Sequence, residues 1–522
     1  MRPVFNAAQS RRADEIMQLE YGYLGILLME TAGRRAAHLI RKLYPMHTRF
    51  VVVAGGGNNG GDGLVIARYL RRYGKELFIL LTKPPEKLTA LARIQYDILT
   101  RFGLTCHVLA PDTLRKLQVF CEQGIKPVLV DALVGVGLDQ PLREPYSSLI
   151  EFLRGLHLPT VAIDLPSGLS ADTGAVWSEP LRCEHTITFQ TAKLCHLITP
   201  AASYCGRVHV VDIGVYPEVI ERIGTRTFWV TEKSVRAFLP PRPLEAHKGT
   251  FGHALIVGGS RGKGGAPALA TVAALRAGAG LASAIVPGSA APSFHRKTLS
   301  GMSLPYGDLA VPYLNEVAAL WAKTPLQGKN AVGIGPGLGN TPETQAFLRE
   351  FLPHVQVPCV LDADALNALA SIEALWERVP KNTIVTPHPG EAARLLGLST
   401  EQVQARRMES ALRLAEKRRV IVLLKGANPL VATPRGEVFL FQLMEPALAT
   451  AGTGDVLTGL ITGLLAQGLS PLRAALLALM AHGIGARMAL RYNSRTSLTA
   501  AGLLKYLGPA FRYLSGGETA TS

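Results

Sequence analysis

Short runs of β-branched and aliphatic residues recur along the chain, and most end in a glycine-rich segment that leads into a helical pattern. Arg49–Ala54 (RFVVVA) is such a run, followed by glycines within residues 55–63 and by helical spacing over residues 64–73. Apolar runs that alternate with helices predict a parallel sheet covered by helices on both faces, an α/β fold. Further strands are predicted at residues 76–81, 127–130, 160–163, 209–211, 253–257, 331–334, 359–361, 383–385 and 420–424.

The runs fall into two series, which predicts two domains. A helical pattern over residues 11–44 precedes the first series, and the second begins at His253–Val257 (HALIV). Between the two, residues 216–248 contain the stiff stretch LPPRP, which is poor in hydrogen-bond donors. We expect a first domain over residues 1–224, a second over residues 225–515 and a frayed tail over residues 516–522.

Composition indicates the cellular compartment expected for this chain. Six cysteines without a CxxC pair or metal-ligand spacing are typical of reduced thiols, so we expect a cytoplasmic protein. The first ten residues lack the apolar segment of a signal peptide. The apolar residues 456–481 are interrupted by Gln467, Pro471 and Arg473, so they predict a buried helix pair and no membrane span.

The charge balance is strongly basic. The 55 Lys and Arg residues against 39 Asp and Glu residues give a net charge of +16, which suits either nucleic acid or anionic phosphate substrates. The basic residues are scattered as singlets and pairs, such as Arg11-Arg12 and Arg418-Arg419, with no long tract interleaved with aromatic residues. We therefore expect solvated surface charge and phosphate attraction, without a nucleic-acid partner.

The sequence AGTGD at residues 451–455 carries the most specific chemistry. It opens the apolar helical stretch, where backbone N–H groups exposed by small residues form an anion site backed by the helix dipole. A carboxylate beside phosphate is unfavourable because both groups are negatively charged, so we expect it to have a chemical role there. Its natural role is to accept a proton from a hydroxyl that attacks a phosphoryl group. Glycines at a helix start are also common for packing alone, so this motif needs support.

Three other segments after predicted strands give that support. They are Lys425 with its following glycine, the TPHPGE segment with His388, and the glycine loop GIGPGLG at residues 333–339. In open parallel sheets, ligands bind at these strand ends. Asp362 and Asp364 in LDADALN either help to hold Mg²⁺ or are buried structural carboxylates.

The first domain has its own set of polar loops. NNGGDG at residues 58–63 lies between a strand and a helix, and its glycines let the backbone approach a pyrophosphate. It is not the GxGxxG motif, and no acidic residue follows at the expected distance. Asp131 in VDALVGVG and Asp164 in DLPSGL each follow a strand, and oxygen ligands without Cys or His favour a hard cation. Each aspartate alone is more often a cap or turn former.

Over residues 225–515, the motifs HKGTFGHALIVGGS, GIGPGLG, LDADALN, TPHPGE, LLKGA and ATAGTGDVLTG resemble the ribokinase-like NAD(P)HX dehydratases. The resemblance implies nucleotide-driven dehydration of a hydrated nicotinamide cofactor to NAD(P)H, with Mg²⁺ and with ADP, or alternatively ATP, as co-substrate. By similarity, Asp455 is the base. The implied substrate contacts are Ala266, Gly337, His388 and Asp455, and the implied nucleotide contacts are Lys425, Gly426, Ala427, Gly452, Thr453 and Gly454.

Two positions depart from the family pattern. Pro429 stands where the family usually has a Thr after KGA-x, and Met444-Glu445 stands where Gly-Asn often precedes the proline before LAT. If these positions line the nucleotide pocket, nucleotide choice or affinity differs from that of the family. The aspartate and both glycines of the anion site are present.

The motifs NNGGDG, VDALVGVG, DLPSGL and TFQTAK resemble the Rossmann-like NAD(P)HX epimerase domain, over roughly residues 5–220. The resemblance implies K⁺ at Asn59, Asp131 and Ser167. It makes Asp164 the acid/base residue that interconverts the R and S hydrates, with Lys193 as a weaker catalytic candidate. The implied substrate contacts are Asn58, Asn59, Gly60, Gly61, Asp62, Gly135, Val136, Gly137, Leu138, Asp139, Gln140, Pro141 and Asp164.

The two halves make one chemical argument. Water adds to one carbon of the nicotinamide ring and creates two epimers, so a dehydratase specific for one epimer needs an epimerase. The whole chain resembles the bifunctional repair enzymes, with NADHX or NADPHX and ADP as partners and a homo-oligomer expected. The alternatives are a ribokinase-fold small-molecule kinase with an accessory domain, or an RNA-binding scaffold use of the first domain.

Overall fold

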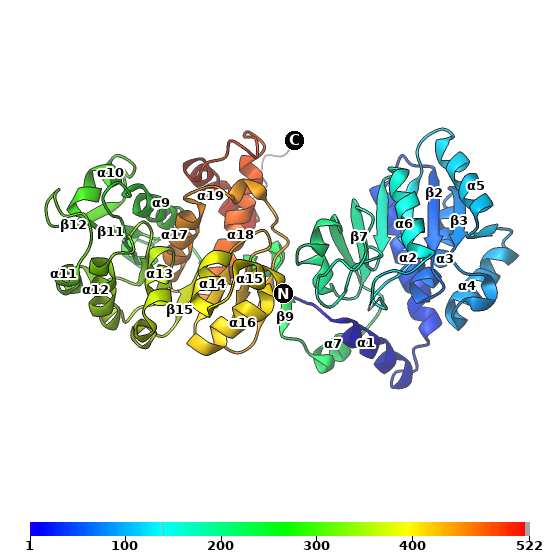
Figure 1. The fold of residues 1–522 in the computed structure, drawn as a ribbon, viewed down its shortest axis with the longest axis horizontal. Helices are drawn as coiled ribbons and strands as arrows, with labels where there is room; N and C mark the ends of the chain where they lie inside the picture. Colours follow the sequence, from blue (N-terminus) through cyan, green and yellow to red (C-terminus); the bar gives the residue numbers. More distant parts are fainter. Residues whose placement is uncertain (139, 517–522) are drawn as a thin grey trace. The chain divides into compact units, whose positions relative to one another are not determined.

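The chain forms two compact units, Arg2–Trp229 and the residues from Val230 onward. The computed structural model describes residues 1–138 and 140–516, and both units are layered α/β structures (Figure 1). The division falls a few residues after the expected boundary, because strand β9 (Thr227–Trp229) pairs with β1 (Arg2–Pro3) at the start of the chain. The expected tail lies outside the described residues except for Gly516.

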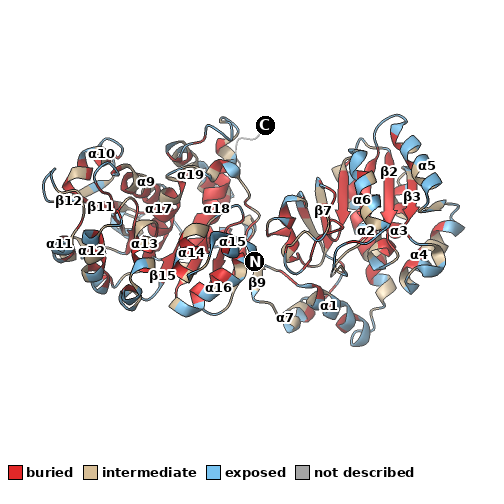
Figure 2. Ribbon diagram, viewed as in Figure 1, coloured by how far each residue is buried: buried red, intermediate tan, exposed pale blue. Residues whose placement is uncertain are grey.

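The first unit contains a seven-stranded sheet in the order β4-β3-β2-β5-β6-β7-β8. All neighbouring strands are parallel, which confirms the predicted parallel sheet. Every residue of β2, β5 and β6 is buried, and Figure 2 shows the central strands in red. The strands are β2 (Arg49–Ala54), β3 (Glu76–Leu81), β4 (Cys106–Val108), β5 (Val128–Ala132), β6 (Thr160–Ile163), β7 (His185–Phe189) and β8 (Arg207–Val211).

Helices cover both faces of this sheet. Ile40 and Leu64 pack with Val52 on one face, whereas Leu117 and Leu149 pack on the opposite face. Alternate residues of a strand point to opposite faces, so one buried strand contributes to both apolar layers. The helices are α1 (Ala7–Leu19), α2 (Gly25–Leu43), α3 (Asn58–Arg72), α4 (Ala90–Arg101), α5 (Pro111–Glu122), α6 (Tyr146–Gly155) and α7 (Pro217–Ile223).

Two local expectations were wrong. The helical pattern over residues 11–44 is divided between α1 and α2, because the chain turns at Gly22, whose φ is +65°. NNGGDG is not a loop but the first turn and a half of α3, which starts at Asn58. A Cβ at Gly63 would lie 2.6 Å from the Cβ of Ala132, so the glycines let the helix start lie directly on β5.

The sheet of the second unit runs in the order β18-β17-β16-β15-β14-β13-β10-β11-β12. The strands from β16 to β12 are parallel, and β17 and β18 add an antiparallel edge. The five strands predicted in this unit all find parallel partners as expected, and only the bounds of β16 differ, by one residue. The strands are β10 (His253–Val257), β11 (Leu281–Pro287), β12 (Met302–Tyr306), β13 (Ala331–Ile334), β14 (Cys359–Leu361), β15 (Thr383–Val385), β16 (Ile421–Leu424), β17 (Leu430–Ala432) and β18 (Val438–Leu440).

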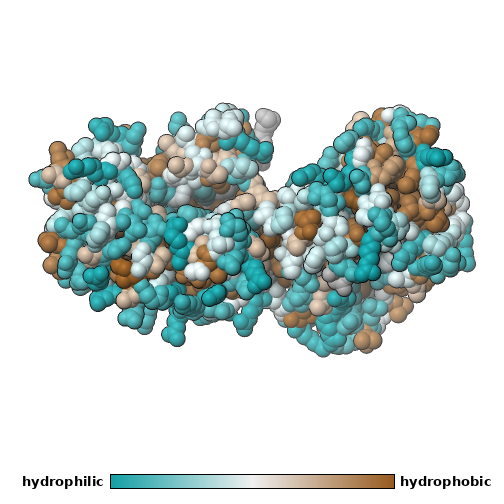
Figure 3. All heavy atoms as spheres, viewed as in Figure 1, coloured by the Kyte–Doolittle hydropathy of each residue, from teal (hydrophilic) through white to brown (hydrophobic). Residues whose placement is uncertain are grey.

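The apolar segment predicted as a buried helix pair forms α17 and α18, most of whose residues are buried. Among the described residues, no helix is long and apolar enough to cross a membrane. On the face drawn in Figure 3, apolar residues form separate patches between hydrophilic ones. The helices are α8 (Glu232–Arg236), α9 (Gly265–Arg276), α10 (Ala291–His295), α11 (Glu316–Leu326), α12 (Pro342–Phe351), α13 (Asp364–Ser371), α14 (Pro389–Leu396), α15 (Thr400–Ala405), α16 (Arg407–Arg418), α17 (Thr453–Ala466), α18 (Pro471–Ala489) and α19 (Ala500–Leu514).

Helices α17 and α9 pack so closely that their backbones are in contact, at a glycine of α17. A Cβ at Gly459 would lie 2.0 Å from the carbonyl oxygen of Ala270, whereas one at Gly508 in α19 would meet nothing within 4 Å. We expect Gly459→Ala to lower the free energy of unfolding by about 1–3 kcal/mol, the usual cost of overpacking. Gly508→Ala, the matched control, should raise it by about 0.5–1 kcal/mol. Denaturant unfolding measures both, and wild-type stability of Gly459→Ala would contradict the close approach.

Candidate active sites

The first candidate site lies at the carboxyl ends of β2, β5 and β6. Because these strands are parallel neighbours, the segments that follow them meet at one sheet edge. A Cβ at Gly55 would lie 1.9 Å from the carbonyl oxygen of Leu133, and one at Gly60 equally close to that of Gly55. The glycines therefore bring the start of α3 onto the end of β5, where first-turn N–H groups can face an anion.

Asp131 and Ser167 are hydrogen-bonded to each other at this edge, and Asn59 in the first turn of α3 lies beside Gly135 of the loop that follows β5. Ser167 donates from Oγ to Oδ1 of Asp131 at 2.6 Å and from its backbone N–H to Oδ2 at 2.9 Å. Among the residues that the structure describes, neither polar atom of the buried Asn59 amide has a hydrogen-bond partner. Buried carboxylate, hydroxyl and amide oxygens, one of them unpartnered, match the ligands of a hard cation. The three residues predicted for K⁺ thus fit that ion.

Asp164 forms a buried ion pair with Lys193. The Lys193 ammonium donates to Oδ1 of Asp164 at 2.6 Å, to Oγ1 of Thr188 at 2.8 Å and to the carbonyl oxygen of Phe189 at 3.3 Å. Burial acts to raise the pKa of Asp164, but the adjacent ammonium outweighs it and the pKa lies below its ordinary value. Asp164 is therefore an ionised carboxylate, and Lys193 is a buried site residue rather than surface charge.

His196 fixes the backbone of Asp164. The φ of Asp164 is +66°, a conformation that a non-glycine residue adopts only under local constraint. Burial lowers the pKa of His196 to about 4, so the ring is neutral. Because Nδ1 accepts from the backbone N–H of Lys193 at 3.0 Å, Nε2 carries the proton and donates to the carbonyl oxygen of Asp164 at 2.9 Å. Thr188 and His196 were not predicted, since nothing in their spacing marks them.

The remaining predicted substrate contacts differ in position. Gly135 packs against Asp164 and Asn59, since a Cβ there would lie 3.1 Å from Oδ2 of Asp164, and Val136 donates its N–H to the same oxygen at 3.3 Å. Asp62 interacts electrostatically with Asp164 and Lys193. Gln140 and Pro141 are exposed and Leu138 packs into the apolar layer around Leu117, so the described structure does not bring these three to the carboxylates. Asp139 lies outside the described residues.

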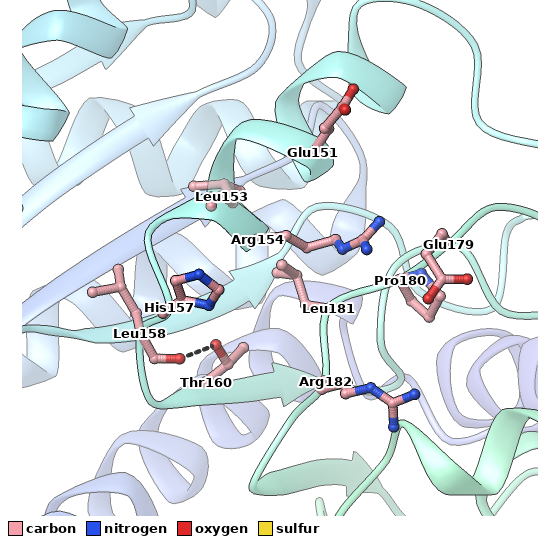
Figure 4. A pocket seen from close by; sticks show the side chains of 11 residues that line it. Glu151, Leu153, Arg154, His157, Leu158, Thr160, Glu179, Pro180, Leu181 and Arg182 are labelled. Atoms are coloured by element: carbon pink, nitrogen blue, oxygen red, sulfur yellow. Dashed lines mark hydrogen bonds between the residues drawn. The ribbon is translucent and has the colours of Figure 1, made fainter.

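A cavity of about 530 Å³ in this unit lies elsewhere. It opens beside Thr160, the first residue of β6, and is bounded by the end of α6 and by residues 179–182 (Figure 4). Strand β6 starts at this cavity and ends at the predicted site, so the cavity lies at the amino ends of the parallel strands and the predicted site lies at their carboxyl ends. None of the predicted site residues that the structure describes lines this cavity.

The second candidate site is the start of α17. Gly452 is the residue before the helix, with a φ of +89°, and a Cβ there would lie 2.8 Å from Leu269. Thr453 and Gly454 form the first turn, and a Cβ at Gly454 would lie 3.4 Å from Nζ of Lys425. A cation therefore lies beside N–H groups at a helix start, an arrangement suited to the anion site that AGTGD predicts.

Asp455 in that first turn has an environment unlike that of Asp164. Burial, and then the negative charge of Asp362, raises the pKa of Asp455 to about 7, while Lys425 opposes the shift. A carboxylate whose pKa is close to neutral is suited to general base catalysis. The position predicted for the catalytic base therefore has matching electrostatics.

Lys425 is held by two carboxylates. Its ammonium donates to Oδ1 of Asp362 at 2.7 Å and lies 3.8 Å from Oε2 of Glu391. Oδ2 of Asp362 accepts from the hydroxyl of Thr458 at 2.7 Å. Burial alone would lower the pKa of Lys425, but the two carboxylates raise it above its ordinary value. Lys425 is thus a permanent cation at the anion site.

This arrangement does not fit a magnesium cage. Both oxygens of Asp362 already have partners, and Asp364 accepts from the N–H of Gly339 at 2.8 Å and from the Asn367 amide at 3.3 Å. Within the described residues, no group of three metal-ligating side chains is present. Of the two alternatives left open by LDADALN, the structure favours structural carboxylates. Mg²⁺ commonly binds through substrate phosphates and retained waters, without a protein cage.

The predicted substrate residues His388, Gly337 and Ala266 also lie at strand ends. His388 caps α14, where Nδ1 accepts from the N–H of Gly390 at 3.0 Å and its own N–H donates to Glu391 at 2.7 Å. The exposed half of this imidazole is available to a ligand. A Cβ at Gly337 would lie 3.1 Å from that of Ala266, so these two residues are in contact.

Arg407, which was not predicted, holds the backbone of residues 425–428, a segment that includes the three predicted nucleotide contacts at 425–427 and is called the nucleotide segment below. It is buried, and Nη2 donates to the carbonyl oxygens of Lys425 and Asn428 at 2.9 Å each. Gly426, with a φ of +129°, lies against the same guanidinium, and Ala427 is exposed next to it. Pro429 is buried directly before β17. The segment is therefore shaped by Arg407.

The second departure has a structural role. Glu445 caps the short turn that follows it by accepting from the N–H of Ala447 at 3.2 Å, and it pairs with Arg495 at 3.3 Å. The turn leads into Thr453, whose hydroxyl donates to the carbonyl oxygen of Leu448 at 2.8 Å. Glu445 thus supports the approach to the anion site.

Two family models match the chain. Residues 26–195 match the YjeF-related protein N-terminus, and residues 254–508 match NAD(P)H-hydrate dehydratase. Among solved structures, the ADP/ATP-dependent NAD(P)H-hydrate dehydratase of Bacillus subtilis, co-crystallised with ATP/Mg²⁺, is 30% identical with a TM-score of 0.47, and covers 54% of this chain and 97% of its own. A ribokinase-like superfamily protein of Enterococcus faecalis V583 is 23% identical with a TM-score of 0.50, over 56% of this chain and 98% of its own. The latter likeness supports the predicted ribokinase-like fold.

Curated relatives match nearly the whole chain. The bifunctional NAD(P)H-hydrate repair enzyme Nnr of Moorella thermoacetica is 37% identical over 97% of this chain and 96% of its own length. The enzyme of the same name from Salinibacter ruber is 39% identical over 96% and 95%, and that of Escherichia coli K12 is 34% identical over 90% and 87%. The chain therefore belongs to the family of bifunctional NAD(P)H-hydrate repair enzymes.

Proposed function

We propose that the first unit interconverts the R and S epimers of NADHX and NADPHX, and that the second dehydrates the S epimer to NAD(P)H, with ADP giving AMP and phosphate. The observation that carries the proposal is that each unit holds its own organised site, centred on Asp164 in the first and on Asp455 in the second. Family membership supports both activities, and the alternatives of a small-molecule kinase and an RNA-binding scaffold explain only one unit each. A cytoplasmic location, a homo-oligomer and the absence of a nucleic-acid partner stay predictions.

The dehydratase mechanism uses two kinds of group at the start of α17, a carboxylate that accepts a proton and positive groups that bind phosphate. Asp455 takes the proton of the ring hydroxyl as that oxygen attacks the terminal phosphorus of the nucleotide. The first-turn N–H groups and the Lys425 ammonium stabilise the charge that develops on the phosphoryl oxygens. The phosphorylated hydroxyl is then a good leaving group. Loss of phosphate from its carbon and of a proton from the adjoining ring carbon to solvent forms the double bond of the dihydronicotinamide, so no stable phosphorylated product accumulates.

In the epimerase site, the protein groups divide between binding and proton transfer. Asn59, Asp131 and Ser167 would hold K⁺, which would supply positive charge for the substrate pyrophosphate near the first turn of α3. Lys193 keeps the Asp164 carboxylate ionised. This carboxylate accepts a proton from, or returns it to, the oxygen that is bound to the hydrated ring carbon.

The two-site assignment predicts separable losses. With chemically hydrated NADH, ADP or ATP, Mg²⁺ and K⁺, recovery of reduced-nicotinamide absorbance measures repair. Asp455→Asn should abolish recovery and leave epimerisation intact, because it removes only the base of the second site. Asp164→Asn should leave only the S epimer rapidly repaired. Equal loss of both activities in either variant would contradict two sites, and phosphorylated product without NADH would favour a kinase.

The dehydratase should depend on pH through Asp455. The pKa of about 7 means that the base is ionised above neutrality and protonated below it. At limiting substrate, the dehydration rate should therefore fall about tenfold per pH unit below the pKa and level off above it. Initial rates on the S epimer between about pH 5.5 and 8.5 would measure this, and a flat profile would mean that Asp455 is not the base.

Exchanging K⁺ for a bulky monovalent cation should affect only the first site. Replacement of K⁺ by tetramethylammonium leaves the buried Asn59 and Asp131 oxygens without their cation, so epimerisation should slow at least tenfold, roughly one lost charge-assisted contact. K⁺ should also raise the melting temperature of the wild-type protein through binding linkage. The variant Asn59→Leu should lose that K⁺-dependent shift, and a shift equal to wild type would place the ion elsewhere.

A further inference from the structure

Helix α1 is anchored next to the epimerase ion pair, although it precedes the residues matched by the family model. The N–H of Phe5 donates to the carbonyl oxygen of Ala192 at 3.0 Å, and Val4 forms a parallel bridge with that same residue. The N–H of Ala7, the first residue of α1, donates to Oδ1 of Asp172 at 2.6 Å. The start of α1 is therefore fixed relative to Lys193, which follows Ala192.

Packing then sets the rotation of α1. Ala13, Ile16 and Met17 are buried in an apolar cluster against which Phe189 packs. Phe189 is also the residue whose carbonyl oxygen accepts from the Lys193 ammonium. Asp14, next to buried Ala13, lies at the border of this buried face and is exposed to solvent.

The Asp14 carboxylate belongs to the same group of charges as Asp164. It interacts electrostatically with Lys193 and Asp164, and Asp62 interacts with Asp14 in turn. Over residues 1–138 and 140–516, no side chain forms an ion pair or a hydrogen bond with this carboxylate. It is therefore accessible to solvent and close to the catalytic pair, with no protein partner of its own.

The surroundings make Asp14 an acid where Asp164 is a base. Although Asp14 is exposed by its overall surface area, protein atoms surround its carboxyl group on most sides, and this desolvation raises the pKa of Asp14 to about 6. Lys193 lowers the pKa in part, and the like charges of Asp164 and Glu15 add to the increase. Asp62 is buried more deeply and its pKa lies well above the ordinary value. Two carboxyl groups whose environments separate their pKa values can act as acid and base at one pH.

Epimerisation needs two such groups. The ring hydroxyl of a hydrated dihydronicotinamide is on the carbon next to the ring nitrogen, so its loss leaves a cation that the nitrogen lone pair stabilises. The hydroxyl must be protonated to leave as water, and the water that adds to the other face must lose a proton. One ionised carboxylate cannot donate the first proton.

We propose that Asp14 is a second catalytic residue of the epimerase site and acts as the general acid opposite Asp164. The inference rests on the epimerase function proposed above. Asp14 gives its proton to the hydroxyl oxygen, the C–O bond breaks with its electron pair on oxygen, and the nitrogen lone pair forms the C=N bond. Water then adds to the opposite face, its oxygen forms the new C–O bond, and its proton passes to Asp164. One water is released and one is consumed. Asp164 then gives its proton to solvent, and solvent returns a proton to Asp14.

The test is Asp14→Asn in the full chain, with Glu15→Gln as the matched control. Glu15 is the next residue of the same helix, is exposed and pairs with Arg12 at 3.2 Å, so its replacement removes the same charge from the same helix. Starting from purified R-NADHX in buffer with K⁺, appearance of the S epimer measures epimerisation. We expect Asp14→Asn to lower kcat at least about 100-fold and Glu15→Gln to leave it within about twofold, the usual contribution of general acid catalysis being 10²–10⁴-fold.

Three outcomes would overturn the inference. One is wild-type kcat in Asp14→Asn, and another is a loss confined to KM, which would make Asp14 a binding residue. The third is wild-type epimerisation in ¹⁸O-labelled water that retains the original oxygen, since the proposed step exchanges it. A K⁺-dependent rise in the melting temperature of Asp14→Asn equal to that of the wild type would exclude misfolding of the first unit as the cause of a loss. A wild-type protein without epimerase activity would instead refute the proposed function itself.

Discussion

A buried lysine–aspartate ion pair lies at the carboxyl edge of each sheet, Lys193 with Asp164 and Lys425 with Asp362. Two opposite charges removed from water are stable only when geometry is close and the remaining hydrogen-bonding capacity is used. Thr188 and Thr458 complete these bonds in the two units. Removal of one partner would leave an uncompensated charge at a cost of about 3–5 kcal/mol, so the surrounding loops are constrained to keep both.

The two ion pairs have different effects, because the proposed catalytic carboxylate is a member of the pair in the first unit and lies outside the pair in the second. In the first unit the aspartate of the pair is itself the carboxylate that we propose to be reactive, and the lysine keeps it ionised. In the second unit the aspartate holds the lysine, and burial together with the negative charge of this aspartate raises the pKa of a separate carboxylate, Asp455. The same kind of ion pair therefore keeps one carboxylate ionised in the first site and helps to bring the pKa of another near neutrality in the second.

Much of this was readable from residue patterns. The predicted strands and the helix at AGTGD are present, because apolar periodicity and glycine at helix starts are local signals. The undivided helix over residues 11–44 was wrong, since the turn at Gly22 depends on how α1 and α2 pack. Asp362 illustrates the same limit, because whether a carboxylate meets a metal or a lysine depends on a residue 63 positions away.

The sequence by itself determined the α/β class, the two series of strand-loop-helix units and the segments that hold Asp455, Asp131 and Asp164, because strand ends and glycine turns are encoded by neighbouring residues. Only the tertiary structure decided the partners of those side chains: Lys193 and His196 for Asp164, Arg407 for the nucleotide segment and the placement of Asp14. These contacts join residues far apart in the chain, and burial and Coulomb interactions depend on distance in space and not on spacing in sequence.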